Sequence, residues 1–528
     1  MTPAAKPSAL TLRDLFLAIL SGLLLTASFP PGKLSFLAWI ALVPLLLSIR
    51  DKPSGSALKL GFTAGFFHYL TLMYWITVVL GRYGNLNLAV SLVALLLLSL
   101  YLALYPALFS YFTSQLDQAA FSPFFMAALW VSLEYARAHL VTGFPWCLLG
   151  YSQYEHLAVI QIADLVGVYG VSFLIILING LFFHSFFGKD GVKRSYLKWE
   201  WLFVVLIMAG TLFYGFHQLS QKKARIKTAP HINAAVVQAN IDQSVKWDPS
   251  FQVKTLETYF RLSRSVGHLK PSLIVWPETA LPLFYQDAPR FSPRMEGLSK
   301  ELGAMLLFGS PAYSRTGRKI EYYNRAYMIA PGISTTRHYD KRHLVPFGEY
   351  VPLKKYLPFI NQLVQAAGNF TSGDRQRPLR EKDLSLGVLI CFEAIFPELA
   401  RDLSREGANL LVNITNDAWF GTTSAPYQHL SMAVFRSVET GIPMVRAANT
   451  GFSAFIGWDG EILSRSPLFE EAVLDRSIPV PSSLPTLYTR TGDLFAGGMV
   501  VVSLLMILYL FQKRLKMKSK REDAHRKK

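Results

Sequence analysis

Long apolar runs separated by short polar segments fill the first 217 residues, and one more apolar run lies near the C-terminus. A helix needs about 20 mostly apolar residues to cross a bilayer, and these runs are close to that length with few charges. The pattern therefore predicts about eight transmembrane helices. Their ranges are 14–29, 34–49, 58–80, 87–112, 119–136, 165–187, 199–217 and 493–511.

The first apolar run is predicted to be a retained helix and not a cleaved signal peptide. It ends in Ser28-Phe29-Pro30-Pro31-Gly32-Lys33, which lacks a small-x-small cleavage pattern, and another apolar run follows at once. The low share of charged residues (17%) and the high share of apolar residues (51%) also indicate an integral membrane protein. Two cysteines are too few for a disulfide scaffold.

Residues 218–491 have the pattern of a folded domain outside the membrane. Short β-rich runs such as 232–239, 272–276, 305–309, 327–330, 384–390 and 409–414 alternate with helical stretches such as 251–266 and 394–405. This alternation predicts an α/β layered domain. The predicted organisation is a membrane domain (1–217), this domain (218–491), a last transmembrane helix (492–511) and a basic tail (512–528).

The net charge of +18 is explained by topology and not by nucleic acid. The tail from Gln512 to Lys528 holds nine Lys/Arg and two Asp/Glu, and basic residues also gather in the loops 50–59 and 189–198. Cytoplasmic loops are enriched in Lys and Arg, so these segments are expected inside the cell and the 218–491 domain outside it. We find neither a nucleic-acid recognition fold nor aromatic residues interleaved with the basic ones.

Three chemically reactive side chains lie at the ends of β-rich runs of this domain or in a loop beside one. Glu278 comes directly after Trp276-Pro277, Lys341 follows Tyr339-Asp340, and Cys391 ends the apolar run 384–390. Taken alone, each has an ordinary structural explanation: the glutamate as a solvated turn residue, the lysine as a surface residue and the cysteine as a small core residue. Together they supply a base, a cation and a nucleophile, which is the set that covalent acyl chemistry requires.

The motifs around these residues resemble the nitrilase (carbon–nitrogen hydrolase) superfamily, whose triad is Glu-Lys-Cys. With the membrane helices, the chain resembles the apolipoprotein N-acyltransferase family over nearly its whole length. The motifs that carry the resemblance are 276–278 (WPE), 341–349 (KRHLVPFGE) and 391–393 (CFE) in the triad, 29–31, 143–146 and 167–170 in the membrane domain, and 238–241, 416–421 and 449–453 in the other domain.

The resemblance implies an α-β-β-α sandwich placed between the last two transmembrane helices of a bacterial inner-membrane protein, on the periplasmic side. It also implies the reaction. A phospholipid gives an acyl chain to the enzyme, which passes it to the α-amine of a diacylglyceryl-cysteine at the N-terminus of an apolipoprotein. The expected partners are these two substrates and the membrane lipids.

The resemblance assigns roles to individual residues. Cys391 is the nucleophile that carries a thioester, Glu278 is the general base, and Lys341 stabilises the oxyanion together with the backbone N–H of Phe392. A tyrosine is expected at position 392 in many relatives, so no hydroxyl role is assigned there. Nearby cations are expected to favour the thiolate of Cys391. Supporting residues that could orient Lys341 are Glu349 and Glu393, and candidates for the acyl entrance are Trp247, Trp419 and Phe420.

No metal or cofactor is predicted, because the eleven histidines and two cysteines show no metal-binding spacing. Cys147 is interpreted as an apolar filler. Two other classes stay open at this point. One is a membrane-tethered amidase or nitrilase with the same triad, although a single helix would suffice as its tether. The other is a transporter, which would need paired ionisable residues or broken helices at the membrane midplane.

Overall fold

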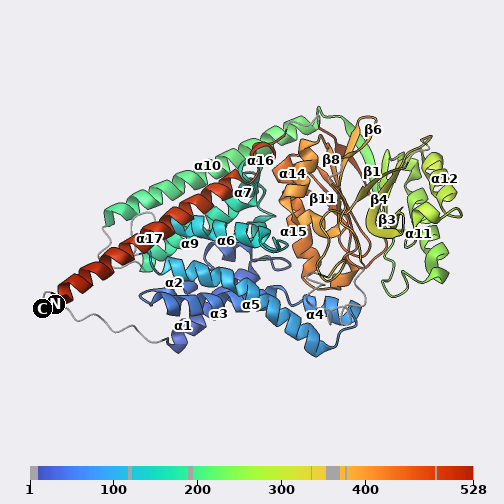
Figure 1. Cartoon of the computed structure of the whole chain (residues 1–528). Coiled ribbons are helices and arrows are strands. Elements are labelled where there is room, and N and C mark those ends of the chain that lie inside the picture. Colours follow the sequence, from blue (N-terminus) through green and yellow to red (C-terminus); the bar gives the residue numbers. More distant parts are fainter. Residues whose placement is uncertain are drawn as a thin grey trace.

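A helical half and an α/β sandwich lie side by side in the computed structural model, which describes residues 10–116, 122–187, 194–333, 336–351, 369–374, 377–481 and 485–526 (Figure 1). The chain leaves the helical half through the long helix α10 and returns to it through α17. The helices of this half are α1 (Leu12–Ala27), η1 (Ser35–Trp39), α2 (Val43–Ile49), α3 (Ser54–Leu72), α4 (Ile76–Val78), η2 (Val79–Tyr83), α5 (Leu88–Thr113), α6 (Ser122–His139), η3 (Leu149–Gln153), α7 (Leu157–Ile160), α8 (Ala163–Val166), α9 (Val168–Phe187), α10 (Arg194–Ile226), α16 (Leu487–Thr491) and α17 (Leu494–Arg526).

Four helices in the described part of the chain are long and apolar enough to cross a membrane: those at Leu88–Thr113, Val168–Phe187, Leu197–Ile226 and Leu494–Lys516. A fifth candidate is α3 together with the segment Ile76–Tyr83, which meet at a bend of 51°. The chain is therefore a membrane protein with several apolar helices. The other three predicted spans fall on α1, on η1 with α2, and on α6, which are not among these candidates.

The predicted span 34–49 is broken because Pro44 stands at the start of α2, where a proline lacks the N–H that a continuous helix needs. The predicted span 58–80 is broken too, since α3 ends at Leu72. Residues 188–193 of the basic loop, residues 119–121 of the fifth span and the last two residues of the basic tail lie outside the described residues.

The sandwich contains two six-stranded sheets. The first has the order β12-β1-β2-β3-β4-β5 and the second the order β11-β10-β9-β8-β7-β6. The strands β1, β2 and β3 are parallel, as are β7, β8 and β9, and the other pairs are antiparallel. Their bounds are β1 (His231–Gln238), β2 (Leu273–Val275), β3 (Met305–Thr316), β4 (Lys319–Ile329), β5 (Arg337–Asp340), β6 (Leu379–Glu381), β7 (Leu384–Ile390), β8 (Leu410–Thr415), β9 (Met444–Ala448), β10 (Ala454–Ile456), β11 (Ile462–Arg465) and β12 (Ala472–Pro479).

Helices cover both outer faces of the sandwich. On the first sheet lie α11 (Gln252–Ser265) and α12 (Ser292–Leu302), at the far end of the molecule from the helical half (Figure 1). On the second lie α14 (Pro397–Arg405) and α15 (Ala425–Thr440), between the sandwich and the helical half. One apolar core fills the space between the sheets, a second lies under α11 and α12, and a third runs without a break from α15 into the membrane helices.

The predicted β-rich runs correspond to β1, β2, β3, β4, β7 and β8, and the helix predicted at 251–266 corresponds to α11. The helix predicted from residue 394 begins later. Residues Cys391–Ile395 form the 3₁₀ turn η7, and α14 starts only at Pro397, whose fixed φ suits a first helical turn. The short strands β5, β6 and β9 to β12 have no counterpart among the predicted runs.

Candidate active site

Glu278 lies just beyond the carboxyl end of β2, where Trp276-Pro277 ends the strand. Its side chain is buried and both of its carboxylate oxygens are held. Oε1 accepts a hydrogen bond of 2.7 Å from the amide of Asn324, and Oε2 accepts one of 2.9 Å from the backbone N–H of Asn416. Two fixed donors leave this carboxylate little freedom to turn, as a positioned base requires.

Lys341 follows the last residue of β5, and its side chain is only 1% exposed. Its Nζ donates to Glu349 Oε1 at 2.9 Å and lies 3.6 Å from Glu278 Oε1. Burial alone would lower the pKa of Lys341, but the charges of Glu349, Glu278 and Cys391 raise it above its ordinary value. Lys341 is therefore a permanent cation in a site that excludes water.

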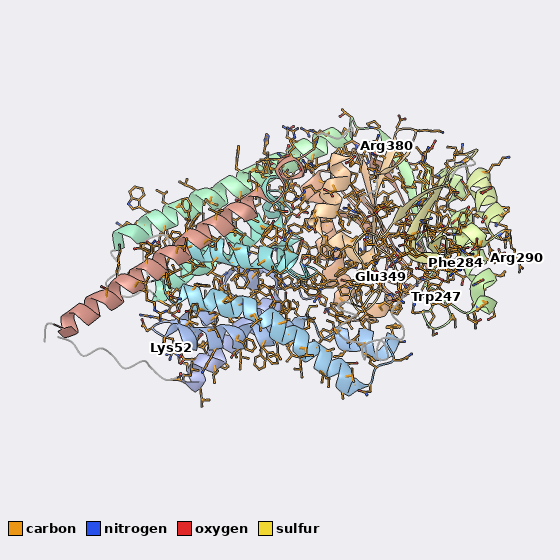
Figure 2. The ribbon with its side chains drawn as sticks, viewed as in Figure 1. Lys52, Trp247, Phe284, Arg290, Glu349 and Arg380 are labelled. Carbon is orange, nitrogen blue, oxygen red and sulfur yellow. The ribbon has the colours of Figure 1, made fainter. Side chains whose placement is uncertain are left out.

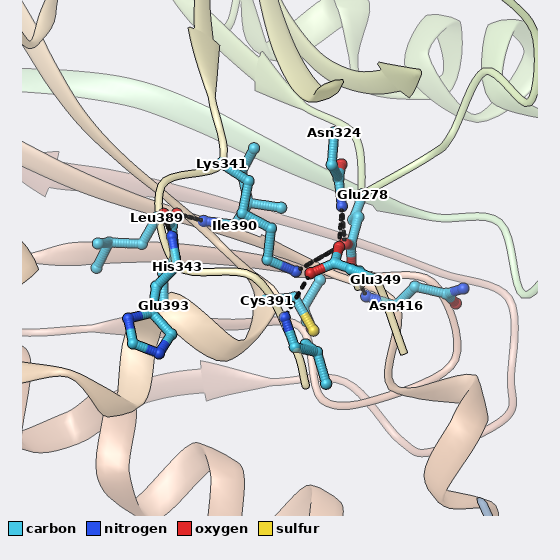
Figure 3. Close-up of polar contacts among 12 residues, drawn as sticks. Glu278, Asn324, Lys341, His343, Glu349, Leu389, Ile390, Cys391, Glu393 and Asn416 are labelled. Atoms are coloured by element: carbon cyan, nitrogen blue, oxygen red, sulfur yellow. Dashed lines mark hydrogen bonds and ion pairs between the residues drawn. The ribbon is translucent and has the colours of Figure 1, made fainter. Parts of the chain in front are cut away.

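Cys391 occupies a strained turn between β7 and η7. Its φ of +51° is in the left-handed region, which residues other than glycine seldom adopt and which occurs preferentially at functional sites. The carbonyl oxygen of Cys391 accepts a hydrogen bond of 3.2 Å from Nε2 of His429 on α15. Figure 3 shows the sulfur of Cys391 facing the same small space as the Lys341 ammonium and the carboxylates of Glu278 and Glu349.

The surroundings of Cys391 do not favour its thiolate in this structure. Burial raises the pKa of the thiol, and the carboxylates of Glu278 and Asp417 raise it further, whereas the positive charge of Lys341 lowers it. The charge of Lys341 thus lowers this pKa as expected, but burial and two carboxylates outweigh it, so the net shift is upward. The resting cysteine is a neutral thiol, so its attack requires a base.

Glu349 and Glu393 occupy different places. Glu349 contacts Lys341 directly, as described above, and also accepts from the amide of Asn324 at 2.8 Å and from the backbone N–H of Val345 at 2.8 Å. Glu393 is fully buried, and its contacts go to backbone groups and Tyr339.

Glu393 connects the segment after Lys341 with the segment before Cys391. It accepts hydrogen bonds from the backbone N–H groups of Ile390 (2.7 Å), Arg342 (2.6 Å) and His343 (3.2 Å). Burial raises the pKa of Glu393 to about 7, although these N–H donors and the charge of Lys341 oppose the rise. Glu393 thus fixes the relative position of two loops and does not orient the Lys341 ammonium directly.

The remaining predicted residues lie around this centre. Phe392 is the second residue of η7, and its ring packs on Phe396. Trp247 is 50% exposed at the lower edge of the sandwich in the view of Figure 2, where Glu349 also lies. Trp419 contacts Tyr83 of η2, and Phe420 contacts Trp75 and Trp146. Two of the three apolar candidates therefore touch the helical half.

Three polar residues at the site escaped the sequence analysis: Asn324, His429 and Lys246. Asn324 stands in the middle of β4, where its amide contacts both Glu278 and Glu349. His429 lies within α15, hydrogen-bonded to Asp417 at 3.0 Å on the side away from Cys391. Nothing in their sequence surroundings distinguishes these two from structural polar residues. Lys246 precedes Trp247, a predicted residue of the acyl entrance, and this neighbour is what could have drawn attention to it.

Within the described residues, no group of three or more His, Cys, Asp or Glu side chains is arranged to hold a metal ion. The arrangement can instead perform covalent acyl transfer. It brings a thiol, a carboxylate and a buried ammonium together just beyond the ends of β2, β5 and β7.

Two paired sheets with Glu, Lys and Cys at their strand ends define a domain of the carbon–nitrogen hydrolase class, and residues 233–483 match the sequence profile described as carbon-nitrogen hydrolase. Residues 21–181 match the apolipoprotein N-acyltransferase N-terminal domain. Among solved structures, a carbon-nitrogen hydrolase from Helicobacter pylori G27 aligns at a TM-score of 0.37 and 18% identity, over 48% of this chain and 90% of that chain.

Relatives that match nearly the whole chain are apolipoprotein N-acyltransferases. The one from Geobacter metallireducens is 45% identical over 511 residues, covering 96% of this chain and 97% of the relative. The one from Pasteurella multocida is 31% identical over 501 residues, covering 93% and 94%. The chain belongs to the apolipoprotein N-acyltransferase family of the nitrilase superfamily. It is an acyltransferase whose function is lipoprotein N-acylation, and neither the tethered hydrolase nor the transporter describes it.

Proposed function

We propose that the chain takes an acyl group from a membrane phospholipid, stores it as a thioester on Cys391, and transfers it to the α-amine of the diacylglyceryl-cysteine of an apolipoprotein. The observation that carries the proposal is the group formed by buried Glu278 and Lys341 with half-buried Cys391 (Figure 3). The phospholipid donor is supported by the apolar helices, which hold this site at a bilayer that contains such esters.

In the first half-reaction, Sγ of Cys391 attacks the ester carbonyl carbon while Glu278 takes the thiol proton. An S–C bond forms, and the negative charge on the carbonyl oxygen is stabilised by Nζ of Lys341 and the backbone N–H of Phe392. The C–O bond to glycerol then breaks. Glu278 returns its proton to the leaving oxygen, which gives a lysophospholipid and the acyl-enzyme.

In the second half-reaction, the lipoprotein amine attacks the thioester carbonyl and gives a proton to Glu278. The new C–N bond forms, the C–S bond breaks, and the leaving thiolate takes the proton back from Glu278. Because both substrates use one site in turn, the kinetics are of the ping-pong type. Water competes with the amine unless the amine is positioned and water is kept out.

The acyl chain enters, in this proposal, along Trp247, Trp419 and Phe420. The contacts of Trp419 with Tyr83, and of Phe420 with Trp75, support an entrance at the junction of the sandwich and the helical half. An aromatic lining there suits an alkyl chain, because it offers apolar area without unsatisfied polar groups.

The proposed topology has eight membrane spans with both termini in the cytoplasm. Its segments are the membrane domain 1–217, the catalytic domain 218–491 in the periplasm of a bacterium, the last helix 492–511 and the cytoplasmic tail 512–528. The basic tail supports it, since Lys and Arg are retained on the cytoplasmic side. A reporter fused after Lys222 should be extracytoplasmic and one after Lys513 cytoplasmic. Reporters on the same side would contradict this topology.

The test of the mechanism is the intact mass of purified enzyme incubated with phospholipid alone. We expect one added acyl chain, released by neutral hydroxylamine and absent in Cys391→Ala, whereas Cys147→Ala should still be acylated. A diacylated lipopeptide with a free amine should discharge the acyl-enzyme, and the same lipopeptide with a blocked amine should not. A Cys391→Ala enzyme that acylates its acceptor at the wild-type rate would refute the proposal.

A further inference from the structure

A second buried lysine lies beside Glu278 and has no part in the mechanism above. Lys246 belongs to the loop that follows β1, and only 1% of its surface is exposed. Its Nζ donates to the backbone carbonyl of Glu278 at 3.3 Å. The same loop carries Gln243, whose side chain accepts a hydrogen bond of 2.8 Å from Asn416, the residue whose N–H holds the Glu278 carboxylate.

Burying an ammonium group costs free energy that a single carbonyl contact does not return. Lysine is almost never fully buried unless a charge pairs with it. The charge that acts on Lys246 is the carboxylate of Glu278, and it opposes the effect of burial. The attraction between the Lys246 ammonium and the Glu278 carboxylate therefore offsets part of the cost of burying this cation.

The charges around Cys391 do not balance without Lys246. Glu278 and Glu349 supply two negative charges, and Lys341 supplies one positive charge that both carboxylates share. Asp417, the other carboxylate that acts on the thiol, is already paired with Arg446 at 2.7 Å. His429, which faces Asp417 and the Cys391 carbonyl, has its pKa lowered by burial and by Arg446, so it is neutral. The surplus negative charge falls on Glu278 and Glu349.

We infer that Lys246 is a positioning residue that supplies the second positive charge of the site and offsets the negative charge that Glu278 and Glu349 place beside Cys391. Without it, the surplus negative charge of this buried site opposes the ionisation of Cys391, so the thiol gives up its proton less readily. The step that depends on Lys246 is the transfer of one proton from Cys391 Sγ to a Glu278 oxygen. This inference rests on the proposed role of Glu278 as base.

The ionisation of Lys246 itself sets a pH limit on this effect. Burial lowers the pKa of Lys246 to about 8, although the charge of Glu278 opposes the shift. Its charge is therefore present at neutral pH and is lost above about pH 8. An arginine at this position stays charged throughout that range.

The experiment measures the rate at which iodoacetamide alkylates Cys391 at a series of pH values, by intact mass, in the full-length enzyme. It uses a Cys147→Ala background, in which Cys391 is the only cysteine. The variants are Lys246→Met, Lys246→Arg and, as a matched control on the exposed face of α11, Lys254→Met. A Cys391→Ala sample corrects for alkylation elsewhere.

We expect Lys246→Met to shift the alkylation profile upward by about one pH unit, so that alkylation at neutral pH is about tenfold slower. Lys254→Met should leave the profile unchanged. Lys246→Arg should match the parent at neutral pH and react severalfold faster than the parent at pH 9, where Lys246 has lost its charge.

Two results would overturn the inference: a Lys246→Met profile equal to that of Lys254→Met, or equal rates for Lys246→Arg and the parent at pH 9. The arginine comparison decides the matter even if the methionine variant folds poorly, because it keeps the buried cation. Alkylation needs no acyl transfer, so a failure of the proposed mechanism appears separately, as activity in Cys391→Ala.

Discussion

The two sheets of the sandwich share one strand arrangement, yet their outer helices have different surroundings. In α11, on the first sheet, six of fourteen residues are buried, which is the pattern of a helix with one face in solvent. In α15, on the second sheet, fifteen of sixteen residues are buried. The helical half covers the face of α15 that water covers in α11 (Figure 1).

The difference extends to the polar residues that each helix carries. Those of α11 form surface ion pairs, such as Arg261 with Glu471. Those of α15 are buried and reach into the helical half, where Gln428 accepts hydrogen bonds from the indoles of Trp75 and Trp146 at 3.1 and 2.8 Å. The nucleophile belongs to the second sheet. The membrane half is thus packed against the layer that supports Cys391, while the base and the cation come from the sheet farther away.

The largest contrast is expected from removing one arginine in each helix. Arg436 of α15 bonds Tyr151 OH at 2.8 Å and pairs with Glu439 at 2.9 Å, with both side chains buried. Arg436→Met leaves Glu439 buried and unpaired, so the free energy of unfolding should fall by about 3–5 kcal/mol. Arg261→Met on α11 should cost less than about 1 kcal/mol, since that pair is exposed. Denaturant unfolding of the two variants in detergent measures both values. Equal losses would mean that the packing of the helical half on α15 does not stabilise the fold more than solvent contact does on α11.

The next effect concerns how each sheet holds its catalytic residue. Gly309 of β3 contacts the Glu278 loop so closely that an added Cβ would lie 2.4 Å from the backbone N of Thr279 and 2.7 Å from Cα of Glu278. Gly309→Ala must therefore displace the base, and we expect kcat/KM to fall about 100-fold.

The matched variant on the second sheet is Gly387→Ala in β7. Its Cβ would meet side-chain atoms only, at 3.0 Å or more, so shifts of a few tenths of an ångström in these neighbours would accommodate it. It should cost stability by about 1–3 kcal/mol and leave kcat/KM within a fewfold of wild type. Steady-state acyl transfer decides between them. A Gly309→Ala enzyme as active as Gly387→Ala would mean that the Glu278 loop is not held by β3.

A smaller effect is expected in the dependence of stability on pH. Burial raises the pKa of Glu393 to about 7, against an ordinary value of 4.5. Between these values folded Glu393 holds a proton that the unfolded chain has released. Its contribution to stability is therefore fully present below pH 4.5 and is lost as the pH rises to about 7.

Glu393→Gln should remove this loss, on the order of 2 kcal/mol between pH 5 and pH 8. The matched control is Glu301→Gln on α12, because a hydrogen bond from Arg264 lowers the pKa of Glu301 and places its titration below this range. Thermal unfolding at several pH values measures the slope. An unchanged slope in Glu393→Gln would contradict the assignment.

The smallest effect belongs to the solvent-facing layer. Gly297 lies inside α12, and an added Cβ there meets nothing within 4 Å. Gly297→Ala should therefore raise the free energy of unfolding by about 0.5–1 kcal/mol through the better helix propensity of alanine, with no change in activity. A loss of stability in denaturant unfolding would mean that this face of α12 is covered after all.

Periodicity and strand-end chemistry were enough to find the two halves of the molecule and to select Glu278, Lys341 and Cys391, which the structure brings together. Long apolar runs and β-rich runs such as 384–390 are local signals that need no knowledge of distant contacts. The exact course of the shorter helices was not predictable in this way. Apolar length alone did not reveal that the predicted span 58–80 is bent after Leu72, where α3 ends, or that α1, α2 and α6 differ from the long spans.

The parts of the site that were missed depend on contacts between distant segments. Asn324 is one of several polar residues in an alternating strand, and its importance comes from Glu278 and Glu349, 46 and 25 positions away. The expected effect of Lys341 on the pKa of Cys391 is present, but the net shift is upward, because the sequence could not reveal the burial of the thiol or the nearness of Asp417. Edge strands such as β12, which pairs with β1, had no recognisable pattern in the sequence either.

The pairing of β1 with β12 also means that the first strand of the sandwich is synthesised long before its partner. These strands align from His231 opposite Pro479 to Gln238 opposite Ala472, at the two ends of the sandwich sequence. At 5–20 residues per second, a ribosome needs roughly 12–50 s to add the ~240 residues that separate them. Throughout that interval β1 is an open sheet edge, a template for pairing with the wrong strand. The last strand made is the one that ends this exposure, so a chain that stalls before residue 472 keeps an unpaired strand edge.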